Sequence, residues 1–273
     1  MHVVVCVKQV PDTTQVRVDP VTNTLIREGI PTVVNPFDYA ALECALTLKD
    51  RYGAKVTLIS MGPPDAVKSL KKCLSYGADR AVLLTDRAFA GSDTFATSYA
   101  LSSAVRRLAD DESVDIVLCG KQTIDGDTAQ TGPGIARHLG WQQVTYIVGI
   151  TEVNAEAGTI TAERKLERGH EIVRTQLPAV VTVVEDAPEL RYASLPGMLH
   201  ALRYAPEVWT TKDVSVDAAF LGLKGSPTKV KRIFPPPHRE GGEIIYADTV
   251  GLEAAVTTVV QLLQQQGALK GRS

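Results

Sequence analysis

The chain has 273 residues, of which 44% are hydrophobic and 22% are charged. This composition is ordinary for a packed protein and excludes a largely disordered chain. The formal net charge of −2 and the lack of a long Lys or Arg run exclude an extended basic surface for a nucleic-acid backbone, so we expect no nucleic-acid partner.

No apolar run approaches the roughly 20 residues that span a bilayer, so we expect no direct membrane insertion. The first residues lead directly into a β-branched run, without the order of basic, apolar and small residues that marks a secretory leader, so we expect a cytoplasmic location. The four cysteines are far apart and lack metal-ligand spacing, so we expect no metal site and reduced, buried thiols at Cys6, Cys44, Cys73 and Cys119.

Short apolar runs rich in β-branched residues recur along the chain, and stretches with helical spacing separate most of them. The runs lie at 3–7, 56–61, 81–84, 116–119 and 179–184, and the helical stretches include 38–48, 66–74 and 93–108. This alternation predicts an α/β fold with a mostly parallel sheet and helices on both faces. Ligands of such sheets bind beyond the carboxyl ends of the strands, so the residues after each run are the candidates for a site.

Two segments interrupt the alternation and predict antiparallel hairpins added to the sheet. Residues 15–28 and 159–175 each alternate apolar and polar residues around a turn. After about residue 205 the sequence becomes rich in Gly and Pro and contains a late amphipathic stretch at 252–263. We therefore predict an α/β domain at 1–205 and, at 206–273, an arm and helix that lie across a partner subunit; a flexible tail is the alternative.

The strongest local signal is a segment rich in Gly, Asp and Thr at 120–134. It follows the run at 116–119 and opens a helix around 135–139. Gly126 and Gly132 permit backbone conformations or close approach that side chains would block. Because the free N–H groups at the start of a helix attract phosphate, the segment suggests a nucleotide loop.

Other interpretations of this segment stay open at the level of sequence. It could be an ordinary surface loop in which Thr128 caps the helix, and spacing alone favours neither reading. Asp125 and Asp127 suggest Mg²⁺ less strongly than a nucleotide, because no third acidic ligand accompanies them. The segment is not a P-loop, and no G-x-G-x-x-G follows the first strand.

Two further segments follow strands and carry polar residues. Asn35 precedes Pro36, so it either caps the next helix or uses its amide to read an adenine edge. The segment at 86–98 combines Gly, Ser and Thr with Asp93, which either caps the following helix or lies beside a phosphate or ribityl group.

Residues for acid–base or nucleophilic catalysis are scarce. The chain has no nucleophile elbow and no H-E-x-x-H motif, and its five histidines are scattered. We predict no catalytic side chain, which suits a protein whose chemistry belongs to a bound cofactor, and we leave open whether the chain counts as an enzyme.

Seven ordered segments resemble one family, the electron-transfer flavoprotein β subunits. They are VCVKQVPD, NPFDYAALE, SMGPPDA, YGADRAVLL, GKQTIDGDTAQTGPGIA, LPAVVTV and RYASLPGMLHA, and they extend over nearly the whole chain. The resemblance implies a Rossmann-like fold that binds an adenine nucleotide, and a heterodimer with an α subunit that carries the electron-transferring FAD.

The resemblance also implies which residues contact the nucleotide. Carried over position by position, the contacts are Cys6, Asn35, Pro36, Phe37, Asp38, Met61, Gly120, Lys121, Gln122, Thr123, Ile124, Asp125, Gly126, Asp127, Thr128, Ala129, Gln130 and Thr131.

The nucleotide loop departs from the pattern of ordinary family members, which resemble Asp-Asp-Asp-Cys/Ala-Asn-Gln-Thr-Gly and bind AMP. Gly126 and Ala129 replace an acid and an amide, which removes charge and bulk beside the phosphate. This loop and the segment around Asp93 are similar to the electron-bifurcating branch, in which the β subunit holds a complete FAD. Asp93, Thr94 and Thr97 would then lie near the diphosphate or flavin.

Membership of the bifurcating branch would imply a set of electron partners. NADH reduces the FAD of the β subunit, one electron passes through the α-subunit FAD to an acyl-CoA-type dehydrogenase or a quinone reductase, and the other passes to ferredoxin or flavodoxin. The alternatives are an ordinary β subunit with structural AMP and a stand-alone adenylate-binding regulatory protein.

The segment RYASLPGMLHA resembles the family's recognition loop, which docks into partner dehydrogenases. It assigns partner contacts to Leu195, Pro196 and Met198, with an exposed Leu195 as an apolar anchor. The alternative is a buried leucine at the start of a helix.

Overall fold

The computed structural model describes residues 1–12, 31–231, 241–242 and 244–269. The chain divides into two compact units, Met1–Ile233 and Phe234–Ser273, which are described separately. The hairpin predicted at 15–28 lies outside the described residues, and the strands before and after it in sequence, β2 (Gln9–Pro11) and β3 (Thr32–Val34), pair antiparallel with each other.

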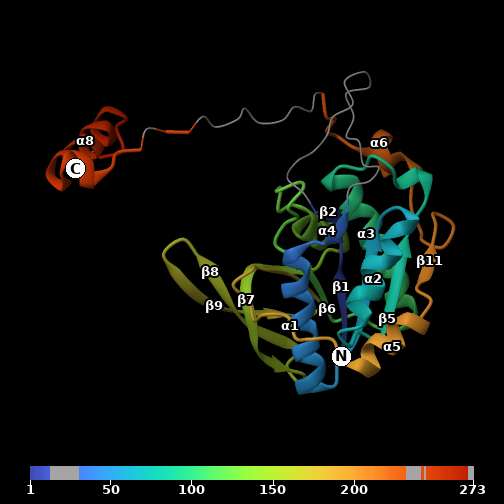
Figure 1. Cartoon of the computed structure of the whole chain (residues 1–273). Coiled ribbons are helices and arrows are strands. Elements are labelled where there is room, and N and C mark those ends of the chain that lie inside the picture. Colours follow the sequence, from blue (N-terminus) through green and yellow to red (C-terminus); the bar gives the residue numbers. More distant parts are fainter. Residues whose placement is uncertain (13–30, 232–240, 243, 270–273) are drawn as a thin grey trace. The chain divides into compact units, whose positions relative to one another are not determined.

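A nine-stranded sheet forms the centre of the first unit (Figure 1). In spatial order its strands are β11 (Glu207–Trp209), β5 (Arg80–Leu84), β4 (Lys55–Met61), β1 (His2–Cys6), β6 (Ile116–Gly120), β10 (Ala179–Val183), β7 (Gln142–Asn154), β8 (Thr159–Leu166) and β9 (Gly169–Gln176). Neighbours from β11 to β7 are parallel, and β7, β8 and β9 pair antiparallel. The predicted α/β class, the five predicted strands and the hairpin at 159–175 are therefore confirmed.

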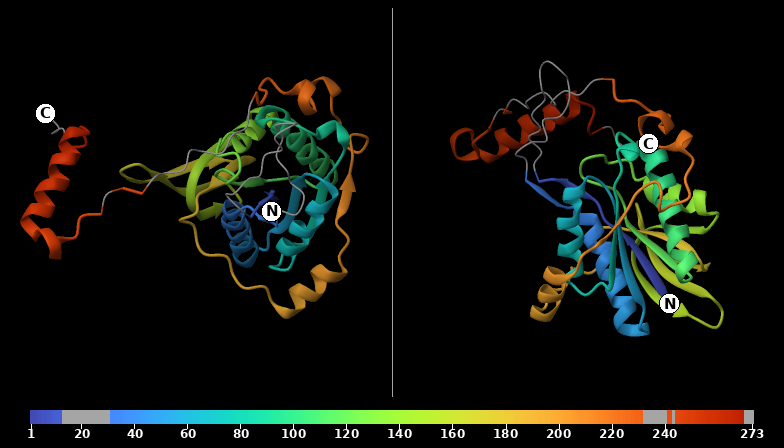
Figure 2. Two further views of the ribbon diagram at one scale, coloured as in Figure 1. Left: turned by 45° about the horizontal axis from the view of Figure 1, so that its top comes forward. Right: turned by 90° about the vertical axis from the view of Figure 1, so that its right-hand side faces the viewer.

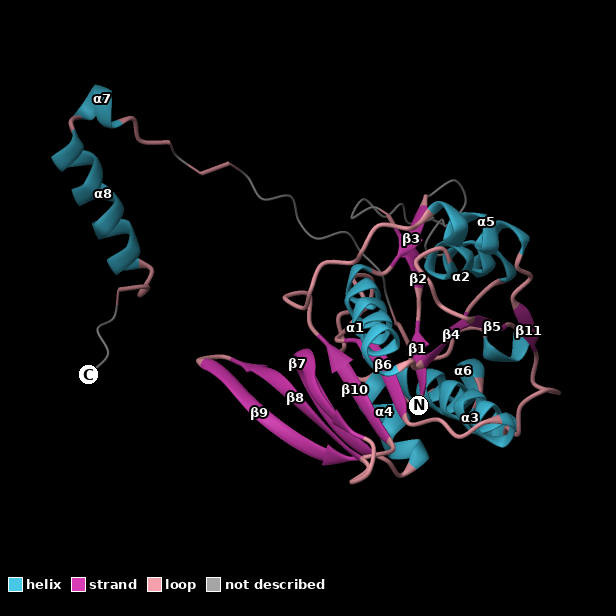
Figure 3. Ribbon diagram, turned by 90° about the horizontal axis from the view of Figure 1, so that it is seen from below, coloured by secondary structure: helices cyan, strands magenta, loops and turns pink. Residues whose placement is uncertain are grey.

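Helices cover both faces of the sheet, as Figure 3 shows from below. The helices α1 (Pro36–Tyr52) and α2 (Val67–Leu74) lie on one face, and α3 (Thr94–Asp111) and α4 (Thr131–Leu139) lie on the other. Alternation along β1 produces this arrangement: Val3 and Val5 belong to the core on the α1 side, whereas Val4 and Cys6 belong to the core on the α3 side.

Short elements complete the first unit. They are the 3₁₀ turns η1 (Pro64–Ala66), η2 (Arg87–Phe89) and η3 (Ala218–Phe220), and the helices α5 (Leu195–Arg203) and α6 (Gly222–Gly225). The residues after 205 begin as a strand, since β11 pairs with β5 at the edge of the sheet.

The second unit contains α7 (Ala247–Val250) and α8 (Leu252–Gln265), so the helix predicted from the amphipathic stretch is present. Large apolar side chains on α8, among them Leu252 and Val256, are exposed within the chain. The predicted contact of the region 206–273 with a partner subunit stays a prediction. In the part of the chain that the structure describes, no helix is long and apolar enough to cross a membrane.

Candidate functional site

The order of the strands reverses at β1, and we call the edge of the sheet at the carboxyl ends of β1 and β6 the crevice. From β1 the chain passes through α1 to β4, the neighbour of β1 on one side. Later it passes from β5 through α3, on the opposite face of the sheet, to β6, the neighbour of β1 on the other side. Ligands of open parallel sheets bind at such a switch point. The segments that border it begin at Val7 and Lys121, so the loop predicted from sequence lies at the position that the topology favours.

Asn35 connects the start of α1 to this loop. The residue is fully buried, and its Nδ2 donates to Asp38 Oδ1 at 2.9 Å and to the Gln122 carbonyl oxygen at 2.9 Å. Its Oδ1 accepts from the Ile124 N–H at 3.2 Å. Asn35 occupies the N-cap position of α1 but makes no side-chain cap bond, so the capping interpretation is wrong. One amide hydrogen binds Asp38 in the first turn of α1, while the other hydrogen and the amide oxygen bind the loop, so Asn35 joins the loop to the helix.

Asp38 lies beneath the crevice and joins α1 to the ends of two strands. Its Oδ2 accepts the Lys8 backbone N–H at 2.7 Å, and the backbone of Gly120 also hydrogen-bonds to the carboxyl group. Burial raises the pKa of Asp38 to about 7, although the hydrogen bonds from Asn35, Lys8 and Gly120 act in the opposite direction. A buried acid therefore sets the spacing of β1, β6 and α1 below the loop.

Side-chain bonds tether the loop along its length. Lys8 Nζ lies 2.7 and 2.8 Å from the two carboxylate oxygens of Asp125, and Gln122 Nε2 donates to Asp127 Oδ1 at 2.9 Å. For Asp125, burial alone would raise the pKa, but the bonds from Lys8 and Thr123 outweigh it and the pKa is lowered. Both acids considered for Mg²⁺ thus have partners in the protein.

The described residues contain no group of three or more His, Cys, Asp or Glu side chains that could hold a metal ion. The bonds of Asp125 with Lys8 and of Asp127 with Gln122 fix the shape of the loop.

The backbone of the loop is strained at two positions. Asp127 has φ 51° and Ala129 has φ 54°, in the left-handed region that side chains disfavour. Strain of this kind is concentrated at ligand-binding segments. Gly126 is not in this region, but a Cβ there would lie 3.3 Å from Thr123 Oγ1, so of the two predicted roles this glycine has the close approach. At Gly132 the predicted close approach is confirmed, because a Cβ there would lie 2.5 Å from Thr182 Cγ2.

The helix after the loop begins without a side-chain cap. The N-cap residue of α4 is Gln130, whose side chain makes no cap bond, so the interpretation of Thr128 as the cap is wrong. The N–H groups of Thr131 and Gly132 in the first turn therefore face the loop side without a capping oxygen. Exposed Thr128 and these N–H groups suit an anionic group such as a phosphate.

The third predicted segment meets the loop at the start of α3. Thr94 Oγ1 donates to Gln130 Oε1 at 3.1 Å, and Thr97, one turn later, is half-buried. Asp93 is the N-cap of α3, as one interpretation predicted: its Oδ1 accepts the N–H groups of Phe95 and Ala96 at 3.0 and 3.1 Å.

The other carboxylate oxygen of Asp93 accepts the N–H and hydroxyl of Thr228 at 2.9 and 2.8 Å. Burial alone would raise the pKa of Asp93, but these bonds lower it. Asp93 therefore supports the edge of the site through its fixed hydrogen bonds.

Cys6 is the last residue of β1, and Cys119 is the residue before the last of the neighbouring strand β6, directly below the crevice. They follow the paired residues Val5 and Leu118 of β1 and β6, and the hydrogen bond between the two thiols and their burial raise the pKa of Cys6. All four cysteines are free and buried, as predicted. Met61 ends β4 at the same edge of the sheet.

Two features of the site were not predicted from the sequence. Lys8, which anchors Asp125, stands in the segment after the first strand, where we looked only for a glycine fingerprint. Tyr146 has φ 61° in β7, donates its N–H to Thr182 Oγ1 at 3.0 Å, and lies with its ring centroid 5.4 Å from Lys121 Nζ. No sequence signal marks this residue.

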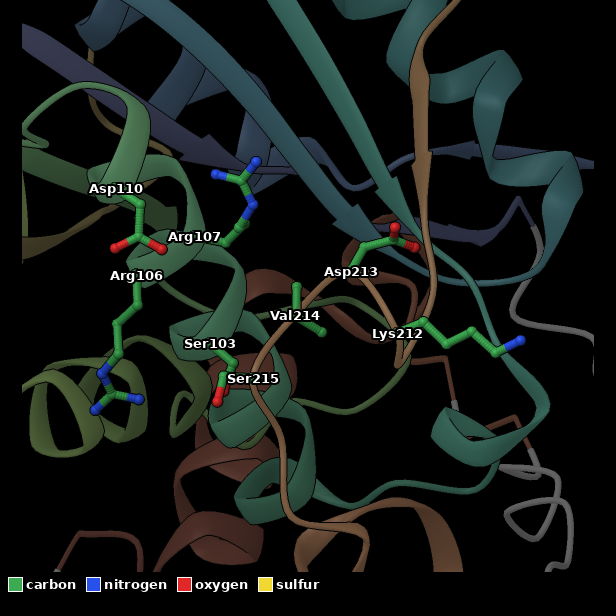
Figure 4. A pocket seen from close by; sticks show the side chains of 8 residues that line it. All are labelled: Ser103, Arg106, Arg107, Asp110, Lys212, Asp213, Val214 and Ser215. Atoms are coloured by element: carbon green, nitrogen blue, oxygen red, sulfur yellow. The ribbon is translucent and has the colours of Figure 1, made fainter.

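A pocket of about 340 Å³ in the first unit lies elsewhere. Figure 4 shows that it is lined by the second half of α3 and by residues 212–215. In this view Arg106 and Lys212 point away from each other, and the Asp213 carboxylate is bonded to Thr210 at 2.7 and 2.8 Å. Its lining includes no residue of the loop at 120–134 and none of the ends of β1 and β6, so this pocket is separate from the crevice.

The predicted partner segment forms the start of α5. Leu195 is 67% exposed and Met198 47% exposed, so the alternative of a buried leucine is wrong. Ser194 caps the helix by accepting the Gly197 N–H at 3.1 Å, and Pro196 occupies its first turn.

Comparison with known proteins yields a family and close relatives. Residues 22–214 match the family model described as "Electron transfer flavoprotein domain". The chain is 49% identical to "Protein FixA" of Azorhizobium caulinodans, over 95% of this chain and 94% of that protein. It is 49% identical to "Protein FixA" of Azotobacter vinelandii, over 90% and 88% of the two chains. It is 48% identical to "Electron transfer flavoprotein subunit beta" of Clostridium acetobutylicum, over 97% and 99%.

Proposed function

Because the chain belongs to the electron transfer flavoprotein family, as a β subunit, we propose that it works in a bifurcating heterodimer and holds the AMP portion of an FAD in the crevice between β1 and β6. A β subunit of this family assembles with an α subunit. The observation that carries the proposal is the strained and tethered loop at the topological switch point. Its fixed shape suits a ligand that is bound tightly and must not move.

The residues present fit a nucleotide. Donors for its phosphate would come from the first turn of α4, from Thr128 and from Thr131, while Asn35 and Asp38 hold the loop from below. When bound, FAD would supply the redox chemistry, accepting electrons from NADH and passing them on singly. The chain itself contributes binding, orientation and fixed hydrogen bonds, and no side chain needs to act as an acid or base.

Two observations support FAD over AMP as the ligand. At Gly126 and Ala129 the loop has neither the acid nor the amide of ordinary members, so an anionic ligand that continues past its first phosphate meets less charge and bulk. Similarity to the proteins named FixA also favours the bifurcating branch. Thr94 and Thr97 would then line the continuation of the ligand, beside the capped start of α3.

The remaining partners follow from the same proposal. The exposed start of α5, with Leu195, Pro196 and Met198, would dock an acyl-CoA-type dehydrogenase or a quinone reductase. A ferredoxin or flavodoxin would accept the second electron. The region 206–273, with the exposed apolar side chains of α8, would contact the α subunit.

Cofactor content tests the proposal directly. The purified heterodimer is expected to contain two FAD and no AMP, and NADH is expected to bleach the flavin absorbance in an anaerobic titration. Acid extraction, chromatography and mass spectrometry identify and count the nucleotides. One FAD with one AMP, and no response to NADH, would instead identify an ordinary β subunit.

Substitution of Gly126 tests the role of charge in the loop. Gly126→Asp is expected to weaken FAD binding by the β subunit about tenfold, because a carboxylate beside the phosphates adds roughly 1–2 kcal/mol of repulsion. Gly126→Asn is the matched control, since it has the same shape without the charge. Equilibrium dialysis of the deflavinated heterodimer measures FAD affinity. If both variants lose the same affinity, then the size of the added side chain and not its charge weakens FAD binding.

A further inference from the structure

The helix α5 presents an apolar stripe to the outside that is wider than the sequence predicted. Leu195 and Leu202 are 67% and 73% exposed, and Leu199 lies between them. The opposite side of the helix is fixed: Ala201 is buried, and Gly197 packs against the Ser75 carbonyl oxygen so closely that a Cβ would collide with it. An ordered helix with this stripe outward is suited to docking, because little conformational entropy is lost on binding.

The chain reaches α5 through residues 184–194, which contain no helix or strand. In the left view of Figure 2 this gold segment leaves the sheet after β10 and passes outside α1 before it enters α5. A crossing without a hydrogen-bonded ladder depends on side chains to fix its path.

Arg191 fixes this crossing to α1. Its backbone N–H donates to Glu43 Oε2 at 3.0 Å, and its guanidinium donates to both Glu43 oxygens, with Nη2 2.8 Å from Oε1 and Nε 3.0 Å from Oε2. The same Nη2 lies 2.8 Å from Asp50 Oδ2. The Glu43 residue is only 7% exposed, so its carboxylate is shielded from water, whereas the Arg191 side chain is half-buried and Asp50 is exposed.

This contact has the most buried carboxylate among the described ion pairs. A forked guanidinium bond to a buried carboxylate is stronger and more directional than a surface pair. The hydrogen bond to Glu43 raises the pKa of Arg191 further above its ordinary value. By contrast, Arg174 and Glu152 lie 3.4 Å apart with side chains 67% and 54% exposed. Among the described ion pairs, those of Arg191 with Glu43 and Asp50 join α1, a helix of the nucleotide site, to the segment before α5.

We propose that Arg191 is a positioning residue that, by its forked contact with Glu43 of α1, holds the apolar stripe of α5 in the orientation needed to dock a redox partner. The inference rests on the proposed function of α5 as a docking surface. In the contacts described, Arg191 touches neither the nucleotide loop nor the exposed stripe. It therefore affects docking by fixing residues 184–194, which in turn set the orientation of α5.

Hydrogen–deuterium exchange on the intact heterodimer tests the structural part. In Arg191→Gln and in Glu43→Gln, exchange of amides in 195–204 is expected to be about tenfold faster than in the parent, whereas amides in 120–134 are unchanged. Arg191→Lys keeps the charge without the fork and is expected to be intermediate. Arg174→Gln is the matched control and is expected to leave both regions unchanged.

Electron-transfer kinetics test the functional part, with a purified acyl-CoA dehydrogenase reduced by its acyl-CoA as the donor. Arg191→Gln is expected to raise KM for the heterodimer about tenfold with kcat within about twofold, and to leave the nucleotide content unchanged. Leu195→Ala alone is expected to raise KM by about tenfold, but by less than about threefold when added to Arg191→Gln, because both changes act on one surface.

The outcomes separate the two levels of the proposal. The positioning role is overturned if Arg191→Gln and Leu195→Ala raise KM independently, so that their effects multiply. It is also overturned if amide exchange in 195–204 is unchanged in Arg191→Gln. If Leu195→Ala has no effect on KM while exchange in 195–204 still rises in Arg191→Gln, then α5 is held by Arg191 but does not dock this donor, and the proposed docking function fails instead. Should Arg191→Gln not assemble, Glu43→Gln and Arg191→Lys serve for the same measurements.

Discussion

Replacement of Asp38 by Asn is expected to change the free energy of unfolding, relative to the parent, by up to about 4 kcal/mol more favourably at pH 8 than near pH 4. Burial raises the pKa of Asp38 from its ordinary value of 3.8 to about 7. Between these two values the folded chain binds the proton more tightly than the unfolded chain does, so a rise in pH favours unfolding. Above pH 7 the full destabilisation is present, and an amide, which does not titrate, avoids it.

Urea unfolding of the parent and Asp38→Asn at pH 4.5, 6 and 8 measures this difference. Near pH 4 both side chains are neutral, so the effect of charge is absent, and the loss of one acceptor oxygen in the amide sets the baseline difference between the two free energies of unfolding. A variant whose stability relative to the parent is lower at pH 8 than near pH 4 would show that the N–H donors of Lys8, Asn35 and Gly120 outweigh burial. That result would place the pKa of Asp38 below 7 and make its carboxylate the true anchor of the crevice.

Gly120→Ala is expected to destabilise the chain by about 2–3 kcal/mol and to abolish nucleotide retention during purification. A Cβ at this position would lie 2.5 Å from Asp38 Oδ1 and 2.7 Å from the backbone carbonyl carbon of Phe37. Neither neighbour can move away easily, because Phe37 is in the first turn of α1 and Asp38 is bonded to Lys8. The added methyl group must therefore separate α1 from β6 at the base of the site.

Thermal unfolding and extracted nucleotide per heterodimer measure the two effects of Gly120→Ala. Gly149→Ala is a suitable control, since an added Cβ there has no heavy atom within 4 Å and the backbone is not left-handed. We expect its stability to stay within about 0.5 kcal/mol of the parent. A Gly120→Ala protein that retains nucleotide would show that the ligand does not depend on the contact between α1 and β6.

The strands of the sheet could be predicted from the sequence because strands that are buried on both faces consist almost entirely of apolar residues. The central strands are near-continuous apolar runs, and the helices between them have apolar stripes, so β1, β4, β5, β6 and β10 were all found. The position of the loop at 120–134 also follows from sequence, since it lies between a buried strand and a helix. Chain order alone does not reveal the switch point, which depends on how non-consecutive strands pair.

What could not be predicted were contacts between residues far apart in the chain. Asn35 has the pattern of a helix cap, but tertiary contacts with residues of the 120–134 loop use its amide instead. Left-handed conformations fall on Asp127 and Ala129 and not on the neighbouring glycine, because tethers such as Lys8 with Asp125 impose the path of the loop. Likewise, Glu43 and Arg191 are 148 residues apart, and no local pattern indicates that they pair.

The helix α1 makes two sets of contacts that depend on its angular phase. Asp38 faces the ends of β1 and β6, and Glu43, a few residues later, faces the crossing segment. Each residue added to or removed from an α-helix rotates all that follows by about 100°. An insertion or deletion between these two carboxylates would therefore turn one of them away from its partner. The number of residues in this stretch is consequently a geometric constraint, stricter than the identity of the residues between them.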